Sequence, residues 1–227
     1  MTAELLPLFP LNTVLFPSMV LPLHIVEERY KLMINTCLAQ DKPFGVVLIY
    51  SGTEVGESAI PHSVGTVARI AHWEWLSDGR INILTAGDRR FRIIEYADPE
   101  QPYLVGSVEF WDDEPLEAPG LSKLVDDVRR NFVDYLTLIM SLSNQSLPVS
   151  QFQLPTGPSM LSYHVAANLQ IDMNDKQDLL EEPSAIARLQ RELTLLRREG
   201  GFLQRLASLQ GSANAEDLPW SGLPYTN

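Results

Sequence analysis

The residues that could act as nucleophiles lie in one stretch of the second half of the chain. Ser159 follows Gly157 and Pro158, and Ser162 stands just before His164. A hydrolytic serine needs a lysine or a histidine that takes the proton from its hydroxyl. The chain has only four lysines, no Gly-x-Ser-x-Gly elbow surrounds either serine, and Gly-Pro-Ser is also typical of a helix start. We therefore expect no catalytic residue, and a serine peptidase is the third hypothesis.

Nucleotide and metal sites are not indicated either. Residues 52–58 have the glycines of a phosphate-binding loop but no lysine, and their two glutamates would repel phosphate. Cys37 is the single cysteine and the four histidines are scattered, which excludes an internal disulfide and a cysteine-based zinc site. We expect no cofactor and no metal.

The densest basic run, residues 89–92, is a candidate contact for phosphate or RNA. In a strand, Arg90 and Arg92 would share one face while Phe91 lies on the other. Nucleic-acid binding needs clustered positive charge, yet this chain has 29 acidic against 17 basic residues and a net charge of -12. We interpret the run as a solvated or ion-paired strand face, with RNA contact as the alternative.

Two tryptophans, Trp73 and Trp75, are the sharpest candidates for binding a polypeptide. Strand residues two apart point the same way, so both indoles would lie on one face. Exposed aromatic rings offer a large contact area at low entropy cost. The alternative is that both pack into the core. The same two interpretations apply to Phe9, Phe16 and Tyr30.

Short strands are expected to position these residues in the first half of the chain. Asp78-Gly79 is a strong hairpin turn between apolar runs at residues 65–75 and 80–85. A second turn is expected at Gly87-Asp88. Residues 44–50 are a continuous β-branched and aromatic run, which is typical of a central strand. Together these patterns predict a small β barrel.

Helical spacing of apolar residues takes over after an acidic, proline-containing linker at residues 111–120. Helices are expected over residues 121–140, from Pro158 to residue 169, over residues 175–181 with Asn174 as the cap, and from Ser184 onward. In the first half, one helix over residues 26–38 carries Cys37 on its apolar stripe, which predicts a buried thiol.

The change in periodicity places the domain boundary at residue 118. We predict an α+β fold with a β-rich domain over residues 1–118, a helical bundle over 119–210 and a loosely ordered tail over 211–227. No run of about 18 apolar residues could span a membrane, and the N-terminal residues lack the basic start of a signal peptide. We expect a cytoplasmic protein that does not bind membranes.

Three segments in this order resemble the N-terminal substrate-binding domain of Lon ATP-dependent proteases. They are residues 7–23, which open with Pro-Leu-Phe-Pro-Leu, residues 65–70, and residues 87–105, which join Arg-Arg-Phe-Arg-Ile to Pro-Tyr-Leu-Val. A further segment at 176–189 extends the resemblance to roughly residues 7–196. The resemblance implies a PUA-like β pseudo-barrel followed by a helical bundle.

The resemblance also implies a function in recognition. We predict a freestanding, non-catalytic module that binds unfolded polypeptides or protein partners, as an adaptor or regulator in protein quality control. The ATPase and protease that the family carries beyond this domain would not fit in 227 residues. The alternative is a PUA-like module that binds RNA or a small ligand, although nucleic acid is not the partner that the charge favours.

Overall fold

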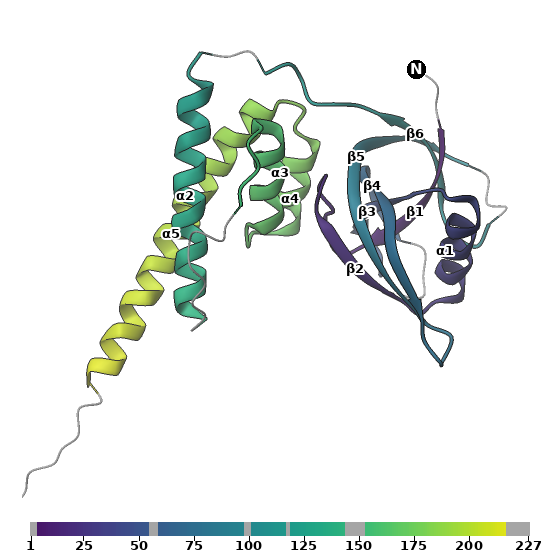
Figure 1. Cartoon of the computed structure of the whole chain (residues 1–227), viewed down its shortest axis with the longest axis horizontal. Helices are drawn as coiled ribbons and strands as arrows, with labels where there is room; N and C mark the ends of the chain where they lie inside the picture. Colours follow the sequence, from purple (N-terminus) through teal and green to yellow (C-terminus); the bar gives the residue numbers. More distant parts are fainter. Residues whose placement is uncertain (1–3, 55–58, 98–100, 117–118, 144–152, 217–227) are drawn as a thin grey trace, which may run out of the picture. The chain divides into compact units, whose positions relative to one another are not determined.

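The computed structural model describes residues 4–54, 59–97, 101–116, 119–143 and 153–216 (Figure 1). Within these ranges the elements follow in the order β1 (Glu4–Leu11), β2 (Val20–Ile25), α1 (Glu28–Gln40), β3 (Phe44–Ser51), β4 (Ile60–Trp75), β5 (Ile81–Tyr96), β6 (Val105–Phe110), α2 (Leu121–Leu142), α3 (Pro158–Asn168), α4 (Met173–Glu181) and α5 (Ala185–Glu216). The described helices include none that is both long enough and apolar enough to cross a membrane.

The strands form a single sheet that closes on itself. Their order is β2-β5-β4-β3-β1-β6. Strand β6, the last in this order, also pairs with β5, and this pairing closes the sheet into a barrel. The β1–β3 pair is parallel and the other pairs are antiparallel. The 16-residue strands β4 and β5 are long enough to take part in both the barrel and a projecting hairpin. The expected α+β fold with a PUA-like pseudo-barrel is confirmed.

Helix α1 covers one side of the sheet, because its apolar stripe matches that face. Met33, Ile34 and Cys37 are buried against the strand residues Ile81 and Ile83. The prediction of a buried Cys37 is therefore confirmed. A second apolar cluster fills the other part of the barrel and contains Leu6, Leu8, Val47, Val67, Phe91, Ile93 and Val108.

The turn expected at Gly87-Asp88 is wrong, since β5 continues through these residues. Thr66 pairs with Arg90 whereas Ala68 pairs with Gly87, so β5 has an extra residue here and forms a bulge. A side chain at Gly87 would collide with the carbonyl oxygen of Phe16. Glycine is needed here because two chain segments pack closely. A glycine in the sequence is typical both of a turn and of such a close approach, so the sequence does not distinguish them.

The helices divide between two compact units. The first unit contains the barrel, Leu154–Leu189 and therefore α3, α4 and the start of α5; the second contains Ser122–Gln153 and the chain from Gln190. The expected boundary at residue 118 assigned all of these helices to one bundle domain, so the contacts divide the chain differently. Helix α5 also continues to Glu216, six residues into the expected tail, whose remainder at 217–227 lies outside the described residues.

The start of α4 also differs from the expectation. Its cap is Asp172, whose carboxylate accepts a hydrogen bond of 2.8 Å from the backbone N–H of Asn174. Asn174 itself lies within the first turn of the helix. Both residue types are good caps, and the sequence pattern selected the wrong one of two close neighbours.

Candidate binding surface

The five aromatic candidates fall into two groups. Phe9, Phe16 and Tyr30 are buried, and the rings of Phe9 and Tyr30 stack with their centroids 4.1 Å apart. These three side chains form part of the core, as the second interpretation of them expected. Trp73 and Trp75 are 48% and 52% exposed, so both indoles are available at the surface.

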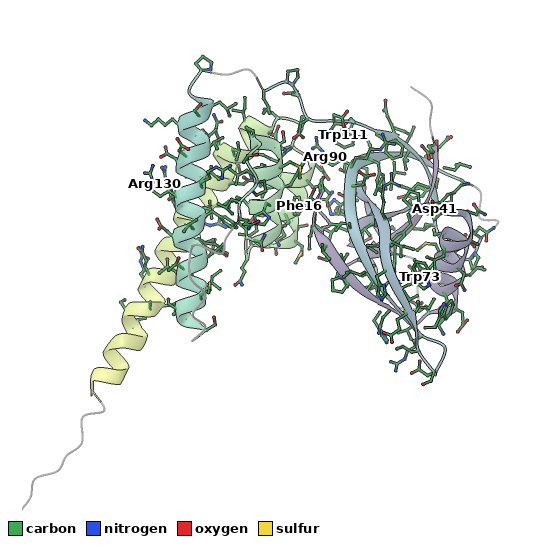
Figure 2. All side chains as sticks on the ribbon, viewed as in Figure 1. Phe16, Asp41, Trp73, Arg90, Trp111 and Arg130 are labelled. Atoms are coloured by element: carbon green, nitrogen blue, oxygen red, sulfur yellow. The ribbon has the colours of Figure 1, made fainter. Side chains whose placement is uncertain are left out.

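The strand register explains where the two tryptophans lie. Trp73 pairs with Ile83 and Trp75 pairs with Ile81, and directly opposite residues in a sheet share a face. Both isoleucines belong to the core that α1 covers. The indoles therefore lie on the α1 side of the sheet, beyond the part that the helix buries. Figure 2 shows Trp73 beside α1, near the hairpin end of β4 and β5.

Shallow pockets separate the tryptophans from α1. The pocket at Trp73 has a volume of about 180 Å³. Its apolar lining comes from Leu38, Pro43 and Ile70, and its charged lining comes from Asp41, Lys42 and Arg69. The pocket at Trp75 has a volume of about 460 Å³ and is bordered by Leu32, a half-exposed leucine of α1. The surface formed by Trp73, Trp75 and this side of α1, which we call the tryptophan surface, is thus indented, with apolar side chains set among charged ones.

The charged groups around the tryptophan surface are largely neutralised in pairs. Lys31 bonds Glu28 at 2.9 Å, Arg69 bonds Asp88 at 2.8 Å and Arg80 bonds Asp78 at 2.7 Å. The side-chain hydrogen bond from Arg80 lowers the pKa of Asp78 to about 2. In the described ranges, no three His, Cys, Asp or Glu side chains lie close enough together to hold a metal ion. The indoles are therefore exposed beside ion pairs, and Asp41, Lys42 and Glu74 are further exposed charges at this surface.

Arg90 and Arg92 share one strand face as expected, since the guanidinium carbon of each lies 4.9 Å from the centroid of the Trp111 ring. Arg92 is exposed, but Arg90 is only 1% exposed. The guanidinium of Arg90 donates to the backbone oxygens of Leu180 and Glu182 at 2.8 Å each. Arg90 is thus committed to acceptors within the protein, which leaves Arg92 as the accessible member of the pair.

A second arginine joins this buried site, and the sequence offered no signal for it. Arg188 is fully buried and bonds both oxygens of Asp113, at 3.0 and 2.7 Å, while Arg90 bonds the first of them at 2.7 Å. The hydroxyl of Tyr163 also donates to Asp113, at 2.7 Å. Figure 2 shows Arg90 on the side of the barrel that faces α3 and α4. We call Arg90, Asp113, Tyr163 and Arg188 the arginine cluster.

The pKa values within the arginine cluster follow from burial and charge. Burial by itself would raise the pKa of Asp113, but the hydrogen bond and charge of Arg188 and the hydrogen bond of Tyr163 outweigh it and hold that pKa below its ordinary value. Burial raises the pKa of Tyr163. The carboxylate therefore stays ionised between two guanidinium groups, and the cluster joins β5 to the helices of its own unit.

The serine candidates lie beside this cluster. Ser162 is fully buried, and its hydroxyl accepts a hydrogen bond of 2.8 Å from Nε of Arg188. Ser159 lies at the start of α3 and contributes a hydrogen bond to Asp113. Both hydroxyls therefore have structural partners in the arginine cluster.

A second indentation lies where α3 meets the barrel. A pocket of about 280 Å³ is lined by Pro17 and Met19 from the segment before β2, by Val20 at the start of β2, and by Met160 and His164 from α3. Met160 and Val20 are exposed. Burial lowers the pKa of His164. This indentation lies between the barrel and helix α3 of the first unit, and both apolar and polar side chains line it.

Comparison with known proteins gives a consistent result. The family described as the ATP-dependent protease La (LON) substrate-binding domain matches residues 5–198. The chain is 30% identical over 204 residues to the Lon protease of Brevibacillus choshinensis and 28% identical over 222 residues to Lon protease 2 of Myxococcus xanthus. These alignments cover 88% and 94% of this chain, but 25% and 26% of those relatives. The chain thus spans about a quarter of the length of the curated relatives it matches.

Solved structures share the fold. The Lon N-terminal domain protein from Xanthomonas campestris is 26% identical, with a TM-score of 0.61 that covers 84% of this chain and 98% of the other. The N-terminal domain of the Mycobacterium avium complex Lon protease has a TM-score of 0.63 over 86% of this chain and 98% of the other. The two sequences are 18% identical, so this similarity supports the fold alone.

Proposed function

The chain belongs to the family of ATP-dependent protease La (LON) substrate-binding domains, and from that premise we propose that it recognises polypeptides through the tryptophan surface without cleaving them. The observation that carries the proposal is the half-exposed pair Trp73 and Trp75 on one strand face. Aromatic side chains are enriched where proteins bind one another, because they bury a large area for few rotatable bonds.

The bound segment would be apolar and exposed only in an unfolded or partly unfolded client. The pockets beside Trp73 and Trp75 are shallow, and their apolar lining is bordered by ion pairs. Such a surface combines apolar side chains with charged ones at its border, namely Asp41, Lys42 and Arg69 at Trp73 and Glu28, Lys31 and Asp78 at Trp75. It accommodates apolar side chains of varied shape, which is what a recognition module for many clients requires.

Two finer statements are part of the proposal. We infer that the chain acts as an adaptor or regulator that presents clients to a separate protease, and that it works in a reducing, cytoplasmic setting. The buried free thiol Cys37 supports the second statement, because free thiols persist in reducing compartments. The commitment of Ser159 and Ser162 to the arginine cluster supports a function without a serine nucleophile.

The test uses one protein in a folded and an unfolded state. Ribonuclease A that is reduced and carbamidomethylated stays unfolded, and we expect the chain to bind it but not native ribonuclease A. Replacing both indoles (Trp73→Ala/Trp75→Ala) should weaken binding about tenfold or more, as expected for interface anchors. The matched control is Tyr96→Ala/Phe202→Ala, because these two aromatic residues are also about half exposed but lie elsewhere.

Isothermal titration calorimetry measures the binding, and circular dichroism establishes that each variant is folded. Equal affinity of the tryptophan variant and the control variant would contradict the assignment of the surface. No binding of unfolded ribonuclease by the original protein would contradict the proposed function itself.

A further inference from the structure

The strand that carries both tryptophans has an open edge. Pairing between β3 and β4 begins at Phe44 and Ala68, whereas pairing between β4 and β5 continues to Trp75 and Ile81. Residues 69–75 therefore pair with β5 on one side, and no described strand pairs with their other side. An open strand edge presents unpaired backbone N–H and C=O groups, which can pair with another extended chain.

The hydrogen-bond pattern shows which backbone groups face this edge. The N–H of Leu76 donates to the carbonyl oxygen of Arg80 at 2.9 Å, so these two residues bond toward each other at the hairpin end. Bonded and non-bonded pairs alternate along an antiparallel ladder. Glu74 is thus in a bonded pair with Asn82, whereas Trp75 and Trp73 are in non-bonded pairs. The N–H and C=O groups of Trp73 and Trp75 point away from β5, toward the open edge.

Proteins usually protect open strand edges against further pairing. Strand β2, the outer strand on the other side of β5, is protected in this way. Among the described strands, β2 pairs only with β5, and it contains Pro22, which has no N–H to offer to another strand. Residues 69–75 of β4 contain no proline. Strand β4 has a register shift against β5 between Ile70 and His72, so its regular pairing at this end runs from His72 to Trp75. The tryptophans therefore lie on the unprotected part of the edge.

We propose that an extended segment of a client polypeptide adds to this edge of β4 as a further strand, bonding to the backbone of Trp73 and Trp75. This inference rests on the proposed function and specifies how the segment binds. Alternate side chains of the added strand would lie on the α1 side, next to the two indoles. The pocket beside Trp73, lined by Leu38 and Pro43, would receive one of them.

The charges around the edge define the composition of the segment. The three ion pairs here are each neutral, while Asp41, Lys42 and Glu74 are exposed and leave a local excess of one negative charge, in a chain of net charge -12. An acidic segment would be repelled. The occupant is therefore an extended segment that alternates apolar side chains and carries no charge or a positive one. Two copies of this acidic chain would repel each other, which favours a client over edge-to-edge pairing.

The probe is a fluorescein-labelled peptide, Lys-Val-Thr-Val-Thr-Val-Thr-Lys, with blocked ends. Two derivatives are made, one N-methylated at the three valines and the other at the three threonines. In a strand, successive N–H groups point to opposite edges, so only one of these sets can bond to β4. We expect fluorescence anisotropy to show a loss of about tenfold or more for one derivative and little change for the other. Loss at the valines indicates antiparallel addition, and loss at the threonines indicates parallel addition.

The remaining outcomes separate this inference from the proposed function. If unfolded ribonuclease A binds in a tryptophan-dependent way but the peptide does not bind, or both derivatives bind alike, strand addition is wrong and the proposed function stands. If neither ribonuclease nor peptide binds, the proposed function fails as well. Sedimentation velocity of the protein alone is the second measurement: a dimer that dissociates on Trp73→Lys would show that a second copy occupies the edge, and would overturn the inference.

Discussion

Arg90 of β5 and Arg188 of α5 share one carboxylate, that of Asp113, although all three are distant in sequence. Both guanidinium groups bond the same oxygen of Asp113, at 2.7 and 3.0 Å, and both also donate to the backbone oxygen of Glu182. Two positive charges that are almost completely buried thus share the carboxylate of Asp113. The barrel and the helices of the first unit are joined at this point.

Loss of that negative charge is expected to destabilise the protein strongly. In Asp113→Asn, two buried guanidinium groups would lose the carboxylate that they share, and breaking a buried ion pair in this way costs about 3–5 kcal/mol. Chemical denaturation followed by circular dichroism measures the free energy of unfolding. The control is Asp134→Asn, because this exposed carboxylate of α2 should contribute within about 0.5 kcal/mol. Equal effects of the two substitutions would contradict the structural importance of the arginine cluster.

The contribution of Asp113 to the free energy of unfolding should decrease as the pH falls into the acid range. Its folded-state pKa lies below the unfolded value of about 3.9. Its stabilisation is therefore fully present well above that pH and is lost as the pH falls through the lower, folded-state pKa. The difference in unfolding free energy between the original protein and Asp113→Asn should be constant from neutral pH to about pH 5 and shrink in stronger acid. Denaturation curves at several pH values measure it, and a difference that persists at the lowest pH would argue against this assignment.

The thiol of Cys37 should be inert in the folded protein. The side chain is 2% exposed, and burial raises its pKa to about 11. Only the thiolate reacts with thiol reagents, so both access and ionisation are suppressed. We expect Ellman's reagent at pH 8 to react with the native protein only slowly and with the urea-unfolded protein at once. Rapid reaction under native conditions would show that α1 opens from the barrel without global unfolding.

Two glycines inside α5 should be replaceable with a gain in stability. Gly200 and Gly201 lie in the continuous helix, and a Cβ built on either would meet no heavy atom within 4 Å. Glycine costs about 0.5–1 kcal/mol relative to alanine in a helix interior. Gly200→Ala should raise the thermal unfolding temperature, as measured by circular dichroism. Gly65→Ala is the contrasting substitution, because its Cβ would collide with the Val46 carbonyl oxygen and the Phe91 ring, and it should lower that temperature.

Local patterns were sufficient for most of the elements. The Asp78-Gly79 turn does join β4 to β5, and the apolar stripe that includes Cys37 does face the core. Both signals depend on neighbouring residues only. The expectation at Gly87 failed because a glycine marks a turn and a close approach of two segments alike, and the second depends on where Phe16 lies.

In the candidate site too, local sequence patterns identify the residues, whereas tertiary contacts decide which of them are exposed. The exposed Trp73 and the buried Phe9 are both aromatic residues in strands, and no local pattern tells them apart. Their burial depends on whether α1 covers that part of the sheet. The open edge of β4 likewise depends on where its pairing with β3 ends.

The sequence by itself determined the fold class, most of the strands and helices, and the family, because periodicity and ordered motifs are properties of the chain. Only the tertiary structure decided which aromatic residues reach solvent, which strand edge stays open and that Asp113 lies between Arg90 and Arg188. These relationships join residues that are far apart in sequence, and packing alone brings them together.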